Sequence, residues 1–566
     1  MKKYAIAAVA ALAAAAVGVT TASAAVKYTA KDLRGLGDHL VGKASSSLAA
    51  DVDGDSVVDA FDLVAMRKQF EHTGKFAVQT IPVTEDYVRY TGRCCYSDGT
   101  AWLVHSASAV DFIVNGKTAE ITIKGDWGIS NGKDQTPRYA VLVDGELILD
   151  ELLTAEEKTI KLFEESEPRV AHVRVIHLSE ANNGAVGVSA ITTNTDLPVP
   201  VAPEFDKKLS IEFIGDSITC GYGVEGANQY ENFKTATENA MKSYAYLTAQ
   251  QLDADYSIVS YSGYGIVSAY SSGGDKNTTG LLPDYYDVIG KPDDYRKPWD
   301  HSAHHYDAIV INLGTNDNTY VSKDADTRSA EYAEGYAAFL EKVHEAHPDS
   351  YIICTLGTMG CTELYPSIEE AVRTFRKNTG YERIMCYQSA TQDQKDGLGS
   401  DWHPSAVTQQ KSAYVLADKI CQALGLESDQ RGLDVAADAK YSTVTSDSAM
   451  MSDYFSDWDK SYYVTTVTGG SGKGSIQTVV SDIGLKKNGK YELKIASAAE
   501  NIKDIPYFVK NKATGKVFLE GTLDASGEVL EEFTSPEDAD CEIVFLIGGA
   551  DSSRFTLKEL KLTRLA

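Results

Sequence analysis

The chain is poor in cysteine, in positive charge and in long apolar runs. Eight cysteines in 566 residues are too few for a scaffold built on disulfides, and Cys354 and Cys386 stand in apolar, strand-like runs typical of buried free thiols. A formal net charge of −28 argues against nucleic acid or an anionic membrane as a partner. After residue 24 no apolar run is long enough to span a membrane. What is left is an acidic chain that is too long for one domain.

Residues 1–24 have the three parts of a secretory signal. Lys2 and Lys3 give a basic start, and a run rich in alanine, valine and leucine follows. Ala22-Ser23-Ala24 then has the Ala-x-Ala form of a cleavage site. A membrane anchor is disfavoured because the apolar run is short. We therefore expect an exported, extracellular protein that is cleaved after Ala24.

An acidic twelve-residue loop at positions 51–62 has the spacing of a calcium site. Acids occupy loop positions 1, 3, 5, 9 and 12, and position 7 offers a main-chain carbonyl, so the expected ligands are Asp51, Asp53, Asp55, Val57, Asp59 and Asp62. The usual glycine at position 6 is Ser56, and position 12 is an aspartate instead of a bidentate glutamate. The regular spacing favours a structural Ca²⁺ site over a solvated acidic loop.

Residues 26–72 contain a repeat. Asp32, Leu33, Leu36 and Leu40 match Asp62, Leu63, Met66 and Phe70 thirty positions later, with helical apolar spacing. The first acidic loop is truncated, so one calcium site is expected. The D-x-D-G-D-S-x-x-D-x-x-D loop and the helix after it resemble a dockerin. The resemblance implies a small helical module, a cohesin of a scaffoldin as partner, a place in a cellulosome and a plant-cell-wall substrate.

Residues 76–200 show short apolar runs separated by turn residues. Residues 169–178 alternate strictly between two faces, and runs at a spacing of about 8–12 residues predict an N-terminal β-sandwich or jelly roll. Trp102 and Trp127 are candidate sugar platforms, although core packing is the more common role of tryptophan. The proline-rich residues 197–203 form a stiff connector to the next domain.

Residues 205–427 alternate between strand and helix patterns. Strands are expected at 209–215, 256–263, 306–314 and 351–356, and helices at 329–347 and 407–424. This alternation predicts an α/β domain whose parallel sheet is covered on both faces. Ligands of such sheets bind beyond the carboxyl ends of the strands.

Four turns carry the residues that could do chemistry there. They are Gly215-Asp216-Ser217, Ser262-Gly263-Tyr264-Gly265, Gly314-Thr315-Asn316-Asp317 and Asp401-Trp402-His403-Pro404-Ser405. A nucleophilic serine needs a strand end, nearby N–H donors and a histidine base. Taken alone the first turn is also compatible with a serine that has no chemical role, but all four in this order favour a nucleophile.

The four blocks resemble those of the SGNH, or GDSL-type, hydrolase family. The resemblance implies a flavodoxin-like parallel sheet, with Ser217 as nucleophile and His403 as general base and acid. It also implies an oxyanion hole made of the Ser217 N–H, the Gly263 N–H and the Asn316 side chain. A β-domain before such a domain, together with the Asp-Trp-His-Pro-Ser block, is similar to carbohydrate esterase family 2.

The acid of the catalytic group departs from the usual spacing. The family places it three residues before the histidine, where this chain has Ser400, and Asp401 stands two residues before it. Some members of carbohydrate esterase family 2 orient the histidine with a main-chain carbonyl. Asp401 is therefore either the third triad member or an acid at a helix start, with His403 held by a main-chain oxygen.

Two further features near the site have alternative interpretations. Residues 221–226 match G-x-G-x-x-G, but the strand before them ends at Gly215, too early for a dinucleotide fingerprint. Trp402 beside the histidine is a candidate sugar-stacking wall or a packing residue.

Residues 433–566 predict a C-terminal β-sandwich similar to jelly-roll carbohydrate-binding modules. Trp458, Tyr462, Tyr463 and Tyr507 either line a sugar site or belong to a purely structural domain.

The sequence as a whole predicts a secreted cellulosomal esterase. It would remove O-acetyl groups from acetylated plant polysaccharide such as xylan or glucomannan, with no metal in the chemistry. The alternatives are an SGNH lipase or thioesterase, which predicts an apolar acyl groove, and a carbohydrate-binding scaffold protein with a degenerate hydrolase domain.

Overall fold

The computed structural model describes residues 77–195, 207–291, 293–427, 434–437, 439–456, 458–524 and 527–565. The predicted signal, the dockerin-like module and all six expected calcium ligands lie outside these residues. The chain divides into two compact units, Met1–Asp206 with Val288–Trp299, and Lys207–Asp287 with Asp300–Ala566. Within the described part of the chain, none of the helices has the length and apolar character that a membrane crossing requires.

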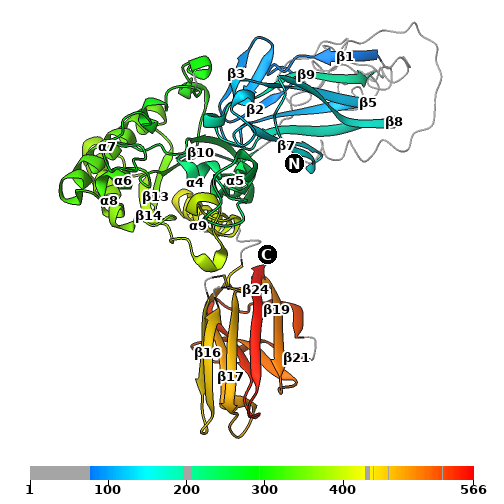
Figure 1. Ribbon diagram of the computed structural model, residues 1–566, viewed down its shortest axis with the longest axis vertical. Helices are drawn as coiled ribbons and strands as arrows, with labels where there is room; N and C mark the ends of the chain where they lie inside the picture. Colours follow the sequence, from blue (N-terminus) through cyan, green and yellow to red (C-terminus); the bar gives the residue numbers. More distant parts are fainter. Residues whose placement is uncertain are drawn as a thin grey trace, which may run out of the picture. The chain divides into compact units, whose positions relative to one another are not determined.

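The first unit is built on a nine-stranded antiparallel sheet (Figure 1). The strands run in the order β3-β4-β9-β5-β8-β6-β7, with β1 on β9 and β2 on β5. They are β1 (Ala77–Ile81), β2 (Arg89–Thr91), β3 (Cys94–Ser97), β4 (Thr100–Leu103), β5 (Ala109–Gly125), β6 (Arg138–Val143), β7 (Glu146–Leu152), β8 (Glu157–His177) and β9 (Val186–Thr195). The predicted β-rich character of this segment is confirmed, while its jelly-roll arrangement stays a prediction.

Alternation along β8 explains how this sheet forms a core. Ala171, Val173 and Val175 are buried, whereas His172 and Arg174 between them are half-buried. Successive strand residues point to opposite faces, so one face of the strand enters the hydrophobic core.

Val288–Trp299 belongs to this unit although it lies far along the sequence. Arg93 is fully buried and donates a hydrogen bond to the Val288 carbonyl at 2.8 Å. Tyr295 donates to the carboxylate of Asp126 at 3.0 Å, and its ring lies 6.0 Å from that of Trp102. Packing therefore accounts for Trp102, one of the two candidate sugar platforms.

The second unit begins with a five-stranded parallel sheet in the order β11-β10-β12-β13-β14. Its strands are β10 (Leu209–Gly215), β11 (Ala254–Ser260), β12 (Ala308–Asn312), β13 (Tyr351–Leu356) and β14 (Ile384–Gln388). Numbered by their order in the chain, the strands lie in the order 2-1-3-4-5 across the sheet, which is the flavodoxin-like arrangement. The order of strand addition reverses between β10 and β12, while all five strands remain parallel. The predicted α/β fold is confirmed, and the expected strand at 351–356 has the same bounds in β13.

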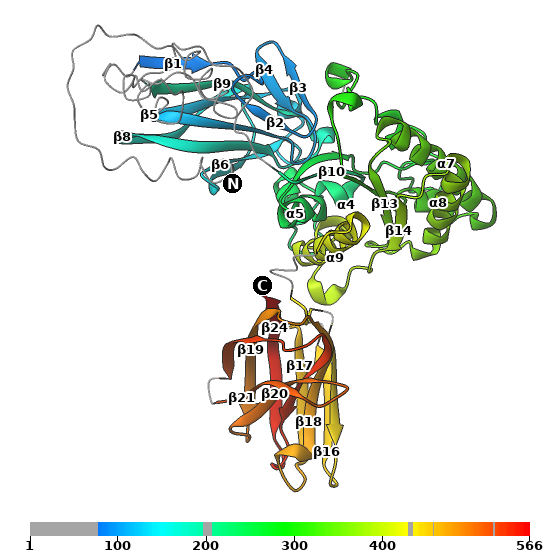
Figure 2. The ribbon, with the colours of Figure 1, turned by 180° about the vertical axis from the view of Figure 1, so that it is seen from behind.

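Helices cover both faces of this sheet (Figures 1 and 2). They are α4 (Ser217–Cys220), α5 (Tyr244–Gln251), α6 (Asp317–Val321), α7 (Ala325–Ala346), α8 (Tyr365–Thr379) and α9 (Ala406–Leu424). α5 packs against α9 and α7 packs against α8, and the two pairs lie on opposite sides of the sheet. The strands are therefore shielded from water on both faces, as their almost uninterrupted apolar sequences predict.

The C-terminal part of this unit consists of two five-stranded antiparallel sheets around one core (Figure 2). Their orders are β15-β18-β23-β20-β21 and β16-β17-β24-β19-β22. The strands are β15 (Lys440–Thr445), β16 (Met450–Ser456), β17 (Ser461–Thr468), β18 (Ile476–Leu485), β19 (Lys490–Glu500), β20 (Ile505–Asn511), β21 (Val517–Leu523), β22 (Glu528–Thr534), β23 (Ala539–Leu546) and β24 (Arg554–Arg564).

The aromatic residues of this domain that are candidates for a sugar site differ in how deeply they are buried. Tyr462 and Tyr507 belong to the shared core, at 4% and 0% exposure, so packing explains both. Trp458 is 95% exposed, and Tyr463 stacks on Tyr454 with ring centroids 5.1 Å apart. The exposed aromatic side chains therefore lie on β16, on β17 and in the turn between them.

Candidate active site

Ser217 lies where β10 gives way directly to a short helix. Asp216 caps α4, its carboxylate accepting the Ile218 N–H at 3.1 Å, and Gly221 ends the helix in the left-handed region at φ +79°. A side chain at Gly215 would collide with Thr219, which explains the glycine in so tight a turn. The serine is thereby held at a helix start just beyond the sheet.

His403 is hydrogen-bonded to this serine. Its Nε2 lies 2.8 Å from Ser217 Oγ, and its Nδ1 lies 3.1 Å from the main-chain oxygen of Asp401. With the Nδ1 proton donated to that carbonyl, Nε2 is free to accept the serine proton. Removal from water lowers the pKa of the imidazole to about 4. The histidine is therefore neutral, as a general base must be, at neutral pH.

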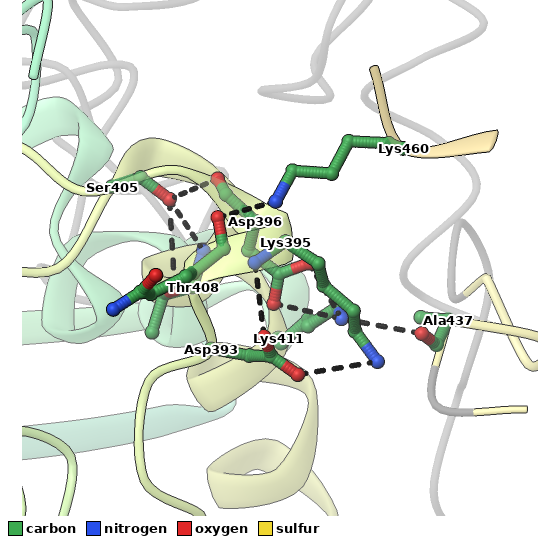
Figure 3. A network of polar contacts seen from close by, with 9 residues as sticks. Asp393, Lys395, Asp396, Ser405, Thr408, Lys411, Ala437 and Lys460 are labelled. Atoms are coloured by element: carbon green, nitrogen blue, oxygen red, sulfur yellow. Dashed lines mark hydrogen bonds and ion pairs between the residues drawn. The ribbon is translucent and has the colours of Figure 1, made fainter. Parts of the chain in front are cut away.

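The main chain that follows His403 is anchored at the start of α9 (Figure 3). Ser405 caps the helix by accepting the Thr408 N–H at 3.3 Å, and its hydroxyl donates to the Asp396 carbonyl at 2.8 Å. The Asp396 carboxylate is paired with Lys411, at 3.0 Å, on the same helix. These bonds fix the main chain two residues after the histidine.

Asp401 does not present its carboxylate to the histidine. The carboxylate accepts the Tyr222 hydroxyl at 2.9 Å and the Phe233 N–H at 3.0 Å. Its backbone lies in the left-handed region at φ +50°, an uncommon conformation that turns its carbonyl toward His403. Of the two alternatives that the sequence left open, this geometry matches the one in which a main-chain oxygen orients the base.

A layer of aromatic rings supports the imidazole. The Tyr222 ring lies 4.2 Å from that of His403 and stacks on Phe233 at 4.0 Å, with the two planes 17° apart. Because Asp401 bonds Tyr222 and Phe233 through its side chain and His403 through its backbone, it links this layer to the base.

The glycine-rich residues after α4 pack against the histidine segment. A side chain on Gly223 or Gly226 would collide with Ser400, whose N–H donates to the Gly223 carbonyl at 2.9 Å. These glycines therefore allow two main chains to approach each other closely, which accounts for them without a dinucleotide.

The three expected oxyanion donors lie at the ends of three neighbouring strands. Asn316 follows β12, and its amide donates to the Tyr264 carbonyl at 2.8 Å and, over a longer 3.4 Å, to the Asp216 carboxylate beside Ser217. Gly263 follows β11 with φ +82°, and Ser217 follows β10. In the part of the chain that the structure describes, the N–H groups of Gly263 and Ser217 have no hydrogen-bond acceptor.

A buried carboxylate holds the loop that bears Gly263. Asp317 accepts the N–H groups of residues 266–268 at 2.8–3.0 Å, just after Gly263. Burial raises its pKa to about 6, against the lowering effect of those bonds. Burial and the nearby Asp317 charge raise the pKa of Asp216 to about 7. Asp317 thus positions both the Gly263 loop and its own neighbour Asn316.

Trp402 stands at the rim of the site. It is 48% exposed, and its ring meets that of Tyr230, which is 75% exposed, edge to face at 5.5 Å. Two adjoining exposed rings next to the base form an apolar wall that is open to a ligand.

Sequence reasoning missed the supporting residues of this site. Tyr222 and Phe233 had no signal, because an aromatic residue in a loop is equally compatible with core packing. Asp317 is part of the Gly-Thr-Asn-Asp block, but only the fold shows that its carboxylate faces the loop after β11.

A serine hydroxyl bonded to an imidazole beyond the carboxyl ends of a 2-1-3-4-5 parallel sheet defines an SGNH-type hydrolase domain. Residues 213–411 match the GDSL-like lipase/acylhydrolase family, and residues 90–203 match the N-terminal domain of carbohydrate esterase 2. The chain therefore carries a GDSL-type hydrolase domain and resembles carbohydrate esterase family 2, as its sequence blocks predict.

Individual relatives agree with these family matches. The cellulase/esterase CelE of Acetivibrio thermocellus is 30% identical over 60% of this chain and 40% of its own length. An acetylxylan esterase/glucomannan deacetylase of Cellvibrio japonicus is 26% identical over 62% of this chain and 92% of its own. The chain thus spans less than half of the first relative and most of the second.

Solved structures show the same likeness. A family two carbohydrate esterase from Clostridium thermocellum, in complex with cellohexaose, aligns with a TM-score of 0.52 at 28% identity, over 60% of this chain and 99% of that one. An acetyl xylan esterase of the rumen bacterium Butyrivibrio proteoclasticus aligns with a TM-score of 0.55 at 23% identity, over 62% of this chain and 99% of that one, and shows the fold alone.

Proposed function

We propose that this chain is a serine carbohydrate esterase that removes O-acetyl groups from plant-cell-wall polysaccharides such as xylan or glucomannan. The observation that carries the proposal is the 2.8 Å contact between His403 Nε2 and Ser217 Oγ at the carboxyl end of β10. The substrate class is supported by the activities named for the relatives, which include acetylxylan esterase and glucomannan deacetylase.

The reaction proceeds in two transfers. Ser217 Oγ attacks the acetyl carbonyl carbon while His403 takes the hydroxyl proton, and the oxyanion is held by the N–H groups of Ser217 and Gly263 and by Asn316. The sugar oxygen leaves with the proton from His403, and an acetyl-serine remains. Water, deprotonated by His403, then attacks this ester, and acetate and free Ser217 are released.

One feature of the site suits a sugar substrate. The exposed rings of Trp402 and Tyr230 offer an apolar wall on which a sugar face can stack, beside the base. No metal takes part in these steps, because the hydrogen-bond donors supply the charge stabilisation.

Acetate release from acetylated xylan and glucomannan tests this function. We expect wild-type activity to be lost in Ser217→Ala and in His403→Ala, and p-nitrophenyl acetate to be cleaved far faster than esters of long fatty acids. Preference for long acyl chains would instead indicate the lipase alternative, and no acetate from any acetylated glycan would refute the proposal.

Export and assembly belong to the same proposal and rest on residue pattern alone. The signal-like residues 1–24 support an extracellular location. The acidic loop at 51–62 supports a structural Ca²⁺ site and, with the dockerin resemblance, docking to a cohesin in a cellulosome.

A further inference from the structure

A groove of about 590 Å³ lies in the hydrolase domain beside the segment that carries His403. Its walls are formed by residues 224–229, Gln394, residues 396–398, residues 405–407 and Lys242. The volume falls in the range of small-molecule pockets in proteins. None of these residues belongs to the hydrogen-bonded group around Ser217.

Two of the walls continue directly from the candidate active site. Ser405 follows His403 by two residues, and Val224 follows Tyr222, whose ring lies 4.2 Å from the imidazole. Figure 3 shows Asp396 and Ser405, which line the groove, bonded to each other. The groove therefore lies next to the segments that carry His403 and its aromatic support.

The charges in the groove are compensated within the protein. Glu225 is paired with Lys242 at 2.7 Å and accepts the Asn239 amide at 3.0 Å. Asp396 is paired with Lys411 at 3.0 Å. Since each carboxylate already has a cationic partner, the groove favours neither an anionic nor a cationic ligand.

The remaining lining suits hydroxyl groups and apolar ring faces. Asn228, Gln229 and Gln394 carry amides that donate and accept hydrogen bonds, as sugar hydroxyls do. Val407, which is 49% exposed, adds apolar surface on which the C–H face of a sugar can rest.

We propose that this groove is a subsite for an uncharged polysaccharide chain, which it binds at sugar units remote from the acetyl group being removed. The subsite rests on the proposed esterase function and determines chain-length preference. It thereby raises the affinity for long substrates without taking part in acyl transfer.

A matched pair of substitutions on one helix tests the subsite. Val407 lines the groove and Val415 does not, and both lie on α9 with 49% of the side chain exposed. The assay compares kcat/KM for acetylated xylo-oligosaccharides of increasing length with kcat/KM for p-nitrophenyl acetate. In Val407→Trp we expect the ratio for the longest chain to fall about tenfold, the equivalent of one or two lost hydrogen bonds. Val415→Trp keeps the wild-type ratio.

A second variant removes hydrogen-bonding groups without adding bulk. In a Ser217→Ala background, the further change Gln229→Ala with Gln394→Ala is expected to weaken binding of an unacetylated xylo-oligosaccharide, measured by calorimetry, and it leaves in place Asn228, whose Oδ1 accepts the Tyr230 N–H at 2.9 Å. Unchanged binding would overturn the subsite.

The outcomes separate the subsite from the esterase function. If wild type releases acetate from the oligosaccharides but Val407→Trp and Val415→Trp have equal ratios, the subsite alone is refuted. If Val407→Trp impairs long and small substrates equally, the residue acts on folding or on the reacting groups, and the subsite is again refuted. If wild type releases no acetate from any oligosaccharide, the esterase function and the subsite fall together.

Discussion

The geometry around Asp401 predicts that Asp401→Asn keeps most of the activity. The substitution retains the main-chain carbonyl that lies 3.1 Å from His403 Nδ1. It also retains an oxygen at the position of Oδ2, which accepts both the Tyr222 hydroxyl and the Phe233 N–H. What is lost is the charge on that acceptor.

The two ways of orienting His403 predict clearly different losses of kcat in Asp401→Asn. Replacing a charged acceptor by a neutral one costs about 1 kcal/mol per hydrogen bond, so two bonds cost about 2 kcal/mol of folding stability. Turnover should change only a few-fold, because the base keeps its orientation. A carboxylate that held the imidazole itself would cost about 10⁴-fold in kcat, roughly 5 kcal/mol of transition-state free energy, on the same substitution.

Steady-state kinetics on p-nitrophenyl acetate, with a denaturant titration of the same protein, measures both quantities. His403→Ala, which removes the base itself, is the control for complete loss. A drop of three or more orders of magnitude in kcat for folded Asp401→Asn would refute the main-chain orientation of the histidine.

Three further predictions concern the base, the oxyanion loop and the calcium loop. Removal from water lowers the pKa of His403 to about 4, and only the neutral form accepts a proton. The midpoint of the acid limb of the kcat/KM profile should therefore lie below pH 5 instead of near 6.5. A pH profile with this midpoint at 6.5 would contradict the prediction. Asp317→Ala removes the acceptor for residues 266–268, so kcat should fall by about 10²–10³ with a smaller change in KM, and an unchanged kcat in a folded variant would exclude the positioning role. Calorimetry should find one calcium site that Asp51→Ala abolishes, while chelation leaves turnover of p-nitrophenyl acetate unchanged; two sites, or loss of turnover, would count against the assigned loop.

The fold of the hydrolase domain could be predicted from the sequence because the sequence signals for its strands and turns are local. The apolar run at 209–215 and the Gly-Asp-Ser turn after it are sufficient to predict β10 and the position of Ser217. Strands buried on both faces have nearly continuous apolar sequences, which is why β13 is predicted with its observed bounds.

The orientation of the base could not be predicted because it depends on one backbone angle. A positive φ at an aspartate leaves no mark in the residue pattern, and the competing signal, an acid near the histidine, points to a triad. The core position of Tyr462 and Tyr507 was equally hidden, since an aromatic residue in a strand has the same sequence whether it faces inward or outward.

The segment Val288–Trp299 determines where the β-rich unit can be separated from the rest of the chain. A chain cut at the proline-rich connector would keep all nine strands of the first sheet but lose the carbonyl that Arg93 bonds and the hydroxyl that bonds Asp126. The β-rich unit is therefore completed only after residue 299 has been synthesised.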